Sequence, residues 1–266
     1  MANKQLSLLD ESEEHDGLRR YLPVLTAVEN GKGVLDVDTV KGCSIGMHRY
    51  PDGGCYGECY AYKTANLYGI DFVTSVSRKL MPFDWVSIFC TVRDHPASWY
   101  RIGTAGDPCH DWSNTLDVCE QLHGTGKVPV IITKHWKDLS DDDVARLNRL
   151  GAVVNTSTSG LDSDAEVKYR VRQIERIRDA GIRSINRVVT CDFGATEWGK
   201  SAKGKQDYLL SIGPVIDNPL RASKHNQRVI DGDIKLKRIE DAIGGSMFVS
   251  LHRSEEHTSE LQSRSA

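Results

Sequence analysis

Short apolar runs rich in Val, Ile and Thr alternate with amphipathic stretches over most of the chain. The runs predict strands at Val34–Val40, Trp99–Thr104, Val128–Thr133, Ala152–Thr156, Ser184–Thr190 and Met247–Leu251. The stretches between them predict helices at Tyr60–Tyr68, Pro82–Arg93, Trp112–His123, Ser140–Leu150 and Ser163–Ala180. Alternation of this kind is typical of an α/β fold with a parallel sheet.

Two of these helices carry clear local signals. Ser140 precedes three Asp residues, which is a favourable N-cap followed by charges that suit the helix dipole. The helix that starts at Ser163 is followed by Gly181, a common residue just after a helix end. Its apolar positions keep helical spacing and predict a core-facing stripe of Val167, Val171, Ile174 and Ile177.

The order of elements also limits the domain organisation. Consecutive strand–helix units without a Gly-rich dinucleotide turn favour a barrel or part-barrel over a Rossmann sheet. We expect a polar segment over 1–30, one regular domain over 31–200, and a less regular part of the same domain over 201–252. The basic stretch Lys200–Gln206 is interpreted as a solvated loop between the last two parts.

Composition sets the broad class. The chain has 266 residues, of which 39% are hydrophobic and 27% charged, which suits a globular protein. No run is apolar enough to span a bilayer, and the polar, acidic start does not resemble a secretory signal, so we expect a cytoplasmic protein without a membrane partner. The net charge of −3 gives no support to a nucleic-acid partner, although such a partner stays open.

The end of the sequence is treated separately. Residues 253–263 read RSEEHTSELQS and resemble the translation of a short-read sequencing adapter. We therefore expect 253–266 to be an artefact, with the natural sequence departing from this one after His252, and exclude them from fold reasoning.

Three of the seven cysteines crowd into one glycine-rich segment that follows the first predicted strand. They are Cys43, Cys55 and Cys59, with spacing C-x11-C-x3-C. An odd cysteine count without an export signal argues against a disulfide framework. Three thiolates on one loop suit an iron–sulfur cluster with one open iron, while His48 as a fourth ligand would suit zinc. Small buried hydrophobic residues are the plainest alternative.

The segment resembles the cluster loop of radical S-adenosyl-L-methionine (SAM) enzymes. That family usually has C-x3-C-x2-C after the first strand of a partial (β/α)6 TIM-type barrel, so the spacing here implies an enlarged loop. The string CYGECYAYK resembles the phage- and bacteria-borne branch in which Tyr-Ala follows the last Cys. The resemblance implies that Cys43, Cys55 and Cys59 hold a [4Fe–4S] cluster.

Other residues acquire roles through the same resemblance. Gly106 and Asp107, after the second regular strand, would receive the amino group of SAM, although a Gly-Asp-Pro turn explains them as well. Tyr56 and Tyr60 would pack beside the cluster and the adenine, or simply in the core.

Three further positions lie at the ends of later strands. Asn155 and Ser157 would meet the ribose and carboxylate of SAM, and they equally suit a Ser/Thr-rich turn leading into the next helix. Arg187 would pair with the SAM carboxylate or form a salt bridge at the end of the barrel. Active sites of barrel enzymes lie at these carboxyl ends of the strands, which is where all of these residues fall.

The implied activity is reductive cleavage of SAM to a 5′-deoxyadenosyl radical that abstracts hydrogen from a substrate. It implies two cofactors, the [4Fe–4S] cluster and SAM, and an external one-electron reductant of the flavodoxin or ferredoxin type. The sequence indicates neither the substrate nor a catalytic side chain. The alternatives are a zinc-stabilised binding module of phage or mobile-element origin, and a radical SAM fold that has lost catalysis.

Overall fold

A seven-stranded, mostly parallel sheet forms the centre of the protein, and a computed structural model describes residues 23–47, 53–74 and 76–236. Its strands, in spatial order, are β1 (Val28–Glu29), β2 (Leu35–Asp36), β5 (Trp99–Ile102), β6 (Val128–Thr133), β7 (Val153–Ser159), β8 (Arg183–Thr190) and β10 (Val215–Pro219). Only the β1–β2 pair is antiparallel. The prediction of an α/β fold with a parallel sheet is therefore confirmed.

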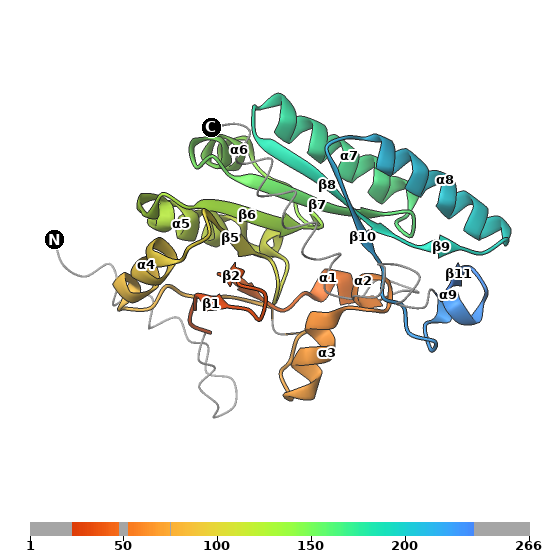
Figure 1. The fold of residues 1–266 in the computed structure, drawn as a ribbon, viewed down its shortest axis with the longest axis horizontal. Helices are drawn as coiled ribbons and strands as arrows, with labels where there is room; N and C mark the ends of the chain where they lie inside the picture. The colour runs from red at the N-terminus through yellow and green to blue at the C-terminus, as the bar shows by residue number, and fades with distance from the viewer. Residues whose placement is uncertain (1–22, 48–52, 75, 237–266) are drawn as a thin grey trace.

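The larger helices connect successive strands of the sheet and lie along one side of it (Figure 1). They are α4 (Trp85–Asp94), α5 (Trp112–Leu122), α6 (Asp141–Arg149), α7 (Asp164–Asp179) and α8 (Glu197–Ser211). Short 3-10 turns flank α5, namely η2 (Pro108–Asp111) and η3 (His123–Thr125). This arrangement brings the carboxyl ends of the parallel strands to one edge.

Smaller elements surround that edge. Three short helices carry the cysteine segment, α1 (Ser44–Met47), α2 (Gly53–Tyr56) and α3 (Tyr60–Leu67), and they lie across from α7 and α8 in Figure 1. Two small antiparallel ladders join β3 (Val40–Lys41) to β4 (Ser77–Arg78) and β9 (Asp192–Phe193) to β11 (Ile234–Lys235). A short helix, α9 (Gln227–Ile230), precedes β11.

The predicted helix starts at Ser140 and Ser163 are confirmed. Each serine accepts a hydrogen bond from the backbone of the third helical residue, and the acidic side chain at that residue accepts one in return. Such capping boxes satisfy amide groups that the first helical turn leaves unpaired. Both helices therefore begin where short-range chemistry places them.

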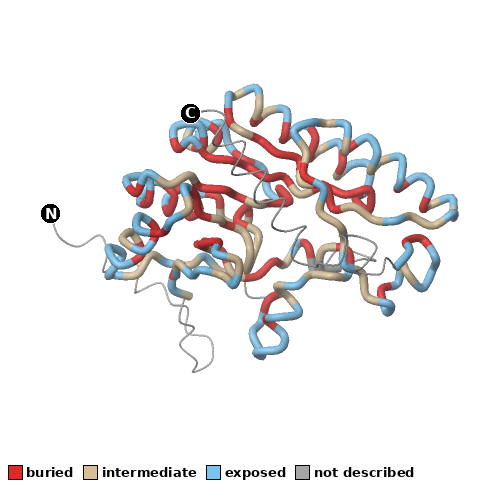
Figure 2. The backbone as a smooth tube through the Cα atoms, viewed as in Figure 1, coloured by how far each residue is buried: buried red, intermediate tan, exposed pale blue. Residues whose placement is uncertain are grey.

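Apolar side chains cover both faces of the sheet. Alternate residues of the strands, such as Ile131 and Val154, pack against α4, α5 and α6. Their neighbours point to the other face and form a smaller cluster of Val34, Trp99, Val130, Val153, Ile185 and Ile216. Figure 2 shows the resulting band of buried backbone along the strands. The predicted stripe of α7 is also buried, against β8 and α8 among other elements.

The prediction of a loop at Lys200–Gln206 is wrong. The segment lies inside α8, which Thr196 caps by accepting a hydrogen bond from Gly199 N. The buried side of this helix includes Ala202 and Leu209. The helical pattern is hard to recognise in the sequence because three exposed or half-exposed lysines and Gly204 interrupt it. Strand β10 then adds to the sheet in parallel with β8, so regular structure continues well past residue 200. The predicted strand Met247–Leu251, His48 and the segment 253–266 lie outside the described residues.

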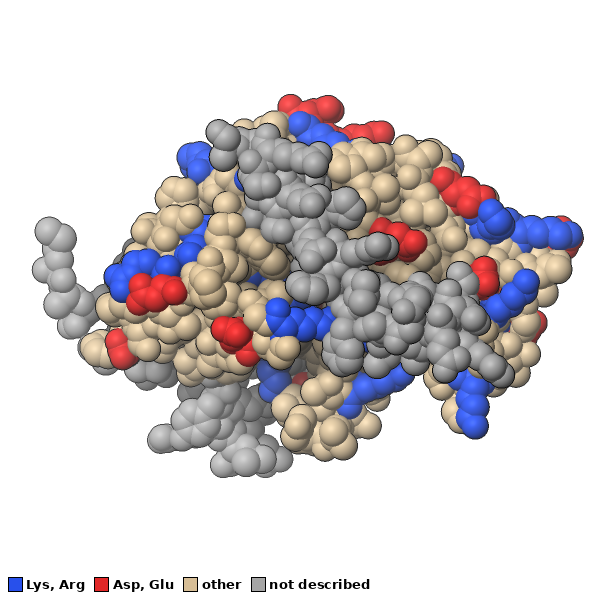
Figure 3. All heavy atoms as spheres, viewed as in Figure 1, with Lys and Arg blue, Asp and Glu red and all other residues tan. Residues whose placement is uncertain are grey.

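Charges of both signs are interspersed on the face shown in Figure 3, where acidic and basic atoms adjoin along α8. Such mixing is expected of a chain with a net charge of −3. None of the helices in the described ranges is both long enough and apolar enough to cross a membrane.

Candidate functional site

The three clustered cysteines come from three consecutive short elements. Cys43 lies between β3 and α1, Cys55 lies in α2, and Cys59 caps the N-terminus of α3. All three thiols are free. Cys55 and Cys59 form a side-chain hydrogen bond. The charge of Cys55 raises the pKa of Cys43, and the charge of Cys43 raises the pKa of Cys59. The fold therefore brings the three sulfurs into one neighbourhood.

Their protonation differs because their surroundings differ. The pKa of Cys59 is lowered to about 7, first by the hydrogen bond from Cys55 and then by amide groups at the start of α3. One of these amides, Tyr62 N, lies 3.4 Å from the Cys59 sulfur. The hydrogen bond between Cys55 and Cys59, together with burial, raises the pKa of Cys55. Burial, and then the charge of Asp107, raise the pKa of Cys43 to about 12. Without a metal, Cys59 is therefore the most readily ionised of the three cysteines near neutral pH.

The turn that carries Cys55 has an unusual backbone. Cys55 and Tyr56 have φ angles of 54° and 66°, a left-handed region that costs non-glycine residues free energy. Gly57 continues the turn with φ of 78°. Asn226, from the distant C-terminal part, holds this turn by donating a 2.8 Å hydrogen bond to the Tyr56 carbonyl. The strained turn is thus fixed by tertiary contacts.

Gly106 lies directly beside the strand that leads to Cys43. Gly42 and Gly106 form a parallel bridge. A Cβ on Gly106 would come within 2.6 Å of the Val40 carbonyl and 2.8 Å of the Gly42 carbonyl. Only glycine fits such a close backbone approach. The Gly106 loop and the backbone that leads to Cys43 are therefore neighbours in the fold.

Asp38, which the sequence analysis did not single out, organises the loop before Gly106. Its carboxylate accepts backbone hydrogen bonds from Gly103, Thr104 and Ala105 at 2.7–2.9 Å. It also accepts from the Thr104 hydroxyl. The Thr104 carbonyl in turn accepts a hydrogen bond from the phenol of Tyr60, whose side chain is otherwise 63% exposed. Tyr60 thus joins α3 to the loop that carries Gly106.

Asp107 is tied to neighbouring elements through both carboxylate oxygens. Oδ1 accepts from Thr133 Oγ1 at 2.6 Å and from Cys109 N at 3.1 Å, and Oδ2 accepts from Lys134 N at 2.8 Å. Asp107 thereby caps η2 and joins the loop after β5 to the end of β6. A carboxylate has further lone pairs, so the predicted contact to an ammonium group stays a prediction.

A network of buried charges lies under the cysteine segment. The Tyr56 phenol donates to Asp162 at 2.7 Å, and the Arg170 guanidinium lies 2.6 Å from the same carboxylate. Lys134 Nζ donates to the Tyr56 phenol and lies 4.2 Å from the centre of its ring. All four residues are buried. The positive charge of Lys134 also favours the thiolate forms of Cys43 and Cys55.

This network was not predicted, although one signal for it exists in the sequence. Arg170 falls three residues after Val167 and four before Ile174, which places a guanidinium in the apolar stripe of α7. A charge at such a position requires a buried partner. Asp162 is that partner, but nothing in the local sequence distinguishes it from an ordinary turn residue.

Trp136 connects the network to the cysteines. Its ring packs against the small buried cluster that contains Cys43, while the Arg170 guanidinium lies 4.8 Å from its centre. A Cβ on Gly46 would lie 3.1 Å from Cys43 Sγ and 3.4 Å from the Trp136 ring. Trp136 Nε1 is buried without a hydrogen-bond partner among the described residues. Cys43 therefore lies near an aromatic ring that is backed by a cation.

The remaining predicted residues lie on strands and not in the loops that carry the cysteines. Ser157 of β7 is paired in register with Arg187 of β8, and Arg187 donates to Asn218 Oδ1 at 3.2 Å. Asn155 is buried, and within the described part of the chain its Oδ1 has no hydrogen-bond partner. By strand alternation Asn155 points to the same face as Val153 and Ile185. An unpaired buried amide oxygen at this place is suited to a polar ligand.

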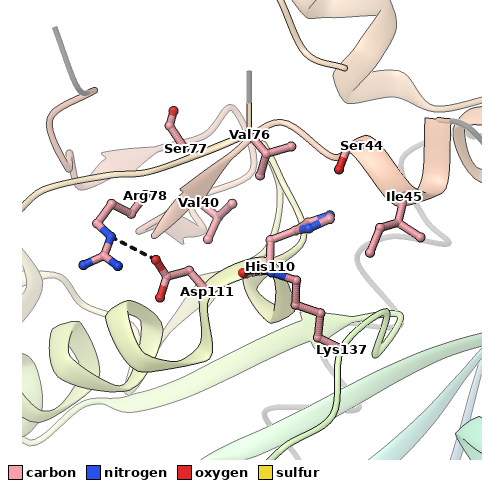
Figure 4. Close-up of a pocket in the computed structure, with 9 residues that line it drawn as sticks. All are labelled: Val40, Ser44, Ile45, Val76, Ser77, Arg78, His110, Asp111 and Lys137. Carbon is pink, nitrogen blue, oxygen red and sulfur yellow. Dashed lines mark hydrogen bonds and ion pairs between the residues drawn. The ribbon is translucent and has the colours of Figure 1, made fainter. Parts of the chain in front are cut away.

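A surface pocket of about 360 Å³ adjoins Cys43 (Figure 4). Its wall is formed by Val40, Ser44, Ile45, Val76, Ser77, Arg78, His110, Asp111 and Lys137. His110 Nε2 lies 3.4 Å from Cys43 Sγ. His110 was not predicted as a site residue, since nothing in its local sequence distinguishes it.

No known family model matches the chain, and a search of curated proteins finds no significantly similar sequence. Functional inference for this protein therefore rests on its own residues.

Proposed function

We propose that this protein is a radical SAM enzyme whose sheet, from β2 to β10, forms the wall of a partial (β/α)6 barrel. The observation that carries the proposal is the grouping of Cys43, Cys55 and Cys59 beside the Gly106 loop, at the carboxyl ends of the strands. Barrel enzymes place their active sites at that edge.

The side chains present fit a [4Fe–4S] cluster. Three soft thiols and no hard carboxylate ligand match its preferred donors. Among the described residues, no group of three or more potential ligands already has metal-binding geometry. The cluster, when bound, would supply the electron for cleavage of SAM, and an external reductant of the flavodoxin or ferredoxin type would supply the electron to the cluster.

The protein's own residues would bind and shield these groups. Lys134 lies near Cys43 and Cys55 and would offset the negative charge of the thiolate ligands. Trp136 would exclude water from one side of the cysteines. Gly106 would keep its loop packed against the backbone that leads to Cys43, and the remaining lone pair of Asp107 would accept a hydrogen bond from the SAM amino group. Asn155, Ser157 and Arg187 would hold its polar groups further along the sheet.

Electron paramagnetic resonance of the anaerobically reconstituted, dithionite-reduced protein tests the proposal. We expect a [4Fe–4S]⁺ signal that changes when SAM is added, because SAM binds the open iron. Ala substitution at Cys43, Cys55 or Cys59 should abolish the signal. Cys90→Ala is the matched control, because Cys90 lies on α4, apart from the cysteine segment. Full iron content in a Cys43→Ala, Cys55→Ala or Cys59→Ala variant would overturn the ligand assignment.

One observation favours a zinc site as the second candidate. His110 Nε2 lies beside Cys43 Sγ, and three thiolates with one imidazole form a complete tetrahedral zinc set. Such a closed site would have a structural role and would not bind SAM. Elemental analysis separates the candidates: one zinc per chain after purification with zinc and iron both supplied, and no cluster signal, would replace the radical SAM proposal.

A further inference from the structure

His110 is held in place at both its backbone and its ring. It lies in η2, which Asp107 caps, and its carbonyl accepts a 2.7 Å hydrogen bond from Lys137 Nζ. Its ring nitrogen Nε2 lies 3.4 Å from Cys43 Sγ, within hydrogen-bonding distance for sulfur. The imidazole therefore has a defined orientation toward this one cysteine.

The His110 ring contacts a sulfur that is itself nearly hidden from solvent. Cys43 is 7% exposed, whereas His110 is half-buried and lines the surface pocket. Figure 4 shows the His110 side chain between the two sides of this pocket, facing Ser44 and Ile45 of α1. Lys137 and Arg78 line the same pocket, and Arg78 pairs with Asp111 at 3.0 Å. His110 is thus a polar group of the pocket wall that also reaches the Cys43 sulfur.

We propose that His110 is a positioning residue that donates a hydrogen bond from Nε2–H to the Cys43 sulfur and raises the reduction potential of the cluster bound there. This inference rests on the proposed function. A metal-bound sulfur carries no proton, so the ring must be the donor in that state. Reduction adds negative charge to the cluster, and a donor to a ligand sulfur stabilises that charge.

The test compares midpoint potentials of the reconstituted holoprotein by redox titration monitored by electron paramagnetic resonance. His110→Leu removes the donor and keeps an apolar side chain in the wall. His110→Gln keeps an N–H donor. Ser77→Ala is the control, because Ser77 lines the same pocket and its hydroxyl is not part of the cysteine neighbourhood. Iron content per chain is measured for each variant, so that loss of folding or of cluster is recognised.

We expect His110→Leu to lower the ratio of reduced to oxidised cluster roughly tenfold at a fixed potential, which is a shift of about 59 mV to lower potential. His110→Gln should recover much of the shift, and Ser77→Ala should leave the potential unchanged. An unchanged potential in His110→Leu would overturn the inference while leaving the proposed function intact. Loss of iron from both His110 variants, in chains that stay folded by circular dichroism, would overturn it also, since His110 would then be a ligand. A wild-type protein without a cluster would overturn both the inference and the proposed function.

Discussion

The Tyr56 phenol donates a 2.7 Å hydrogen bond to Asp162, a fully buried carboxylate that lies 106 residues further along the chain. Asp162 also faces the Arg170 guanidinium at 2.6 Å. One carboxylate in the turn between β7 and α7 thus holds the cysteine segment and neutralises a buried cation.

Removal of the Asp162 charge should therefore be costly. Asp162→Asn leaves the buried Arg170 with only the more distant Glu166 carboxylate, 3.6 Å away, as counter-charge, and we expect a loss of about 3 kcal/mol in the free energy of unfolding. Urea denaturation of the metal-free protein measures it. Asp207→Asn is the control, because Asp207 pairs with Lys203 on the exposed side of α8 and should change stability by less than about 0.5 kcal/mol. Equal effects of the two substitutions would contradict the structural role given to Asp162.

Two glycine substitutions should have opposite effects. Gly106→Ala places a Cβ against the Val40 and Gly42 carbonyls, and because these are backbone atoms the loop must shift. We expect destabilisation by at least about 1 kcal/mol and loss of the response to SAM. Gly204→Ala lies in the interior of α8 with open space around it, and should stabilise the protein by about 0.5–1 kcal/mol. Thermal unfolding measures both, and a stabilised Gly106→Ala variant would refute the close packing.

Cys59 should be the first of the three cysteines to react in the metal-free protein. Its pKa of about 7 gives a large thiolate fraction at pH 7.5, whereas the pKa of Cys43 is raised to about 12. Iodoacetamide labelling followed by peptide mass spectrometry should show Cys59 modified well before Cys43. The labelling rate at Cys59 should rise as pH increases through about 7. Faster labelling of Cys43 would show that the hydrogen bond from Cys55 and the amide groups at the start of α3 do not stabilise a thiolate at Cys59.

His135 should make the protein sensitive to mild acid. Burial lowers the pKa of His135 to about 4, below its unfolded value of about 6.5. Between these values the unfolded state takes up a proton and the folded state does not. The contribution of neutral His135 to the free energy of unfolding is therefore fully present above about pH 6.5. It is lost as the pH falls toward 4, by up to about 1.4 kcal/mol per pH unit.

His135→Asn removes this titration and suits the backbone φ of 50° at this position, because Asn tolerates the left-handed region. The variant should show a flatter dependence of unfolding free energy on pH between 6.5 and 4. An unchanged slope in urea unfolding at several pH values would contradict the assignment.

The features that were predictable from the sequence depend on neighbouring residues. Ser140 and Ser163 start helices through contacts within one turn, and the stripe of α7 follows a regular period. The cysteines were predictable as a group because they lie close together in the chain. Strand β10 was not, since Val215–Pro219 is short, ends in proline and is defined by pairing with β8.

The residues that hold the site together were harder to predict from the sequence, because each is a single residue whose partners lie far away in the chain. Asp38, Asp162 and His110 resemble ordinary surface residues in the sequence. Their roles appear only when the fold places them beside Gly103, Tyr56 and Cys43. Arg170 is the exception, because its position in an apolar stripe is already unusual for a charge.

The contacts that fix the strained turn at Cys55 and Tyr56 also imply an order of assembly. Asp162, Lys134 and Asn226 are 106, 78 and 170 residues from Tyr56, so none of them can hold the turn until the sheet and its helices have formed. In a zinc finger the metal drives the chain to fold. Here the scaffold comes first, and a cofactor delivered to the cysteines would bind to a chain whose sheet and helices have already formed.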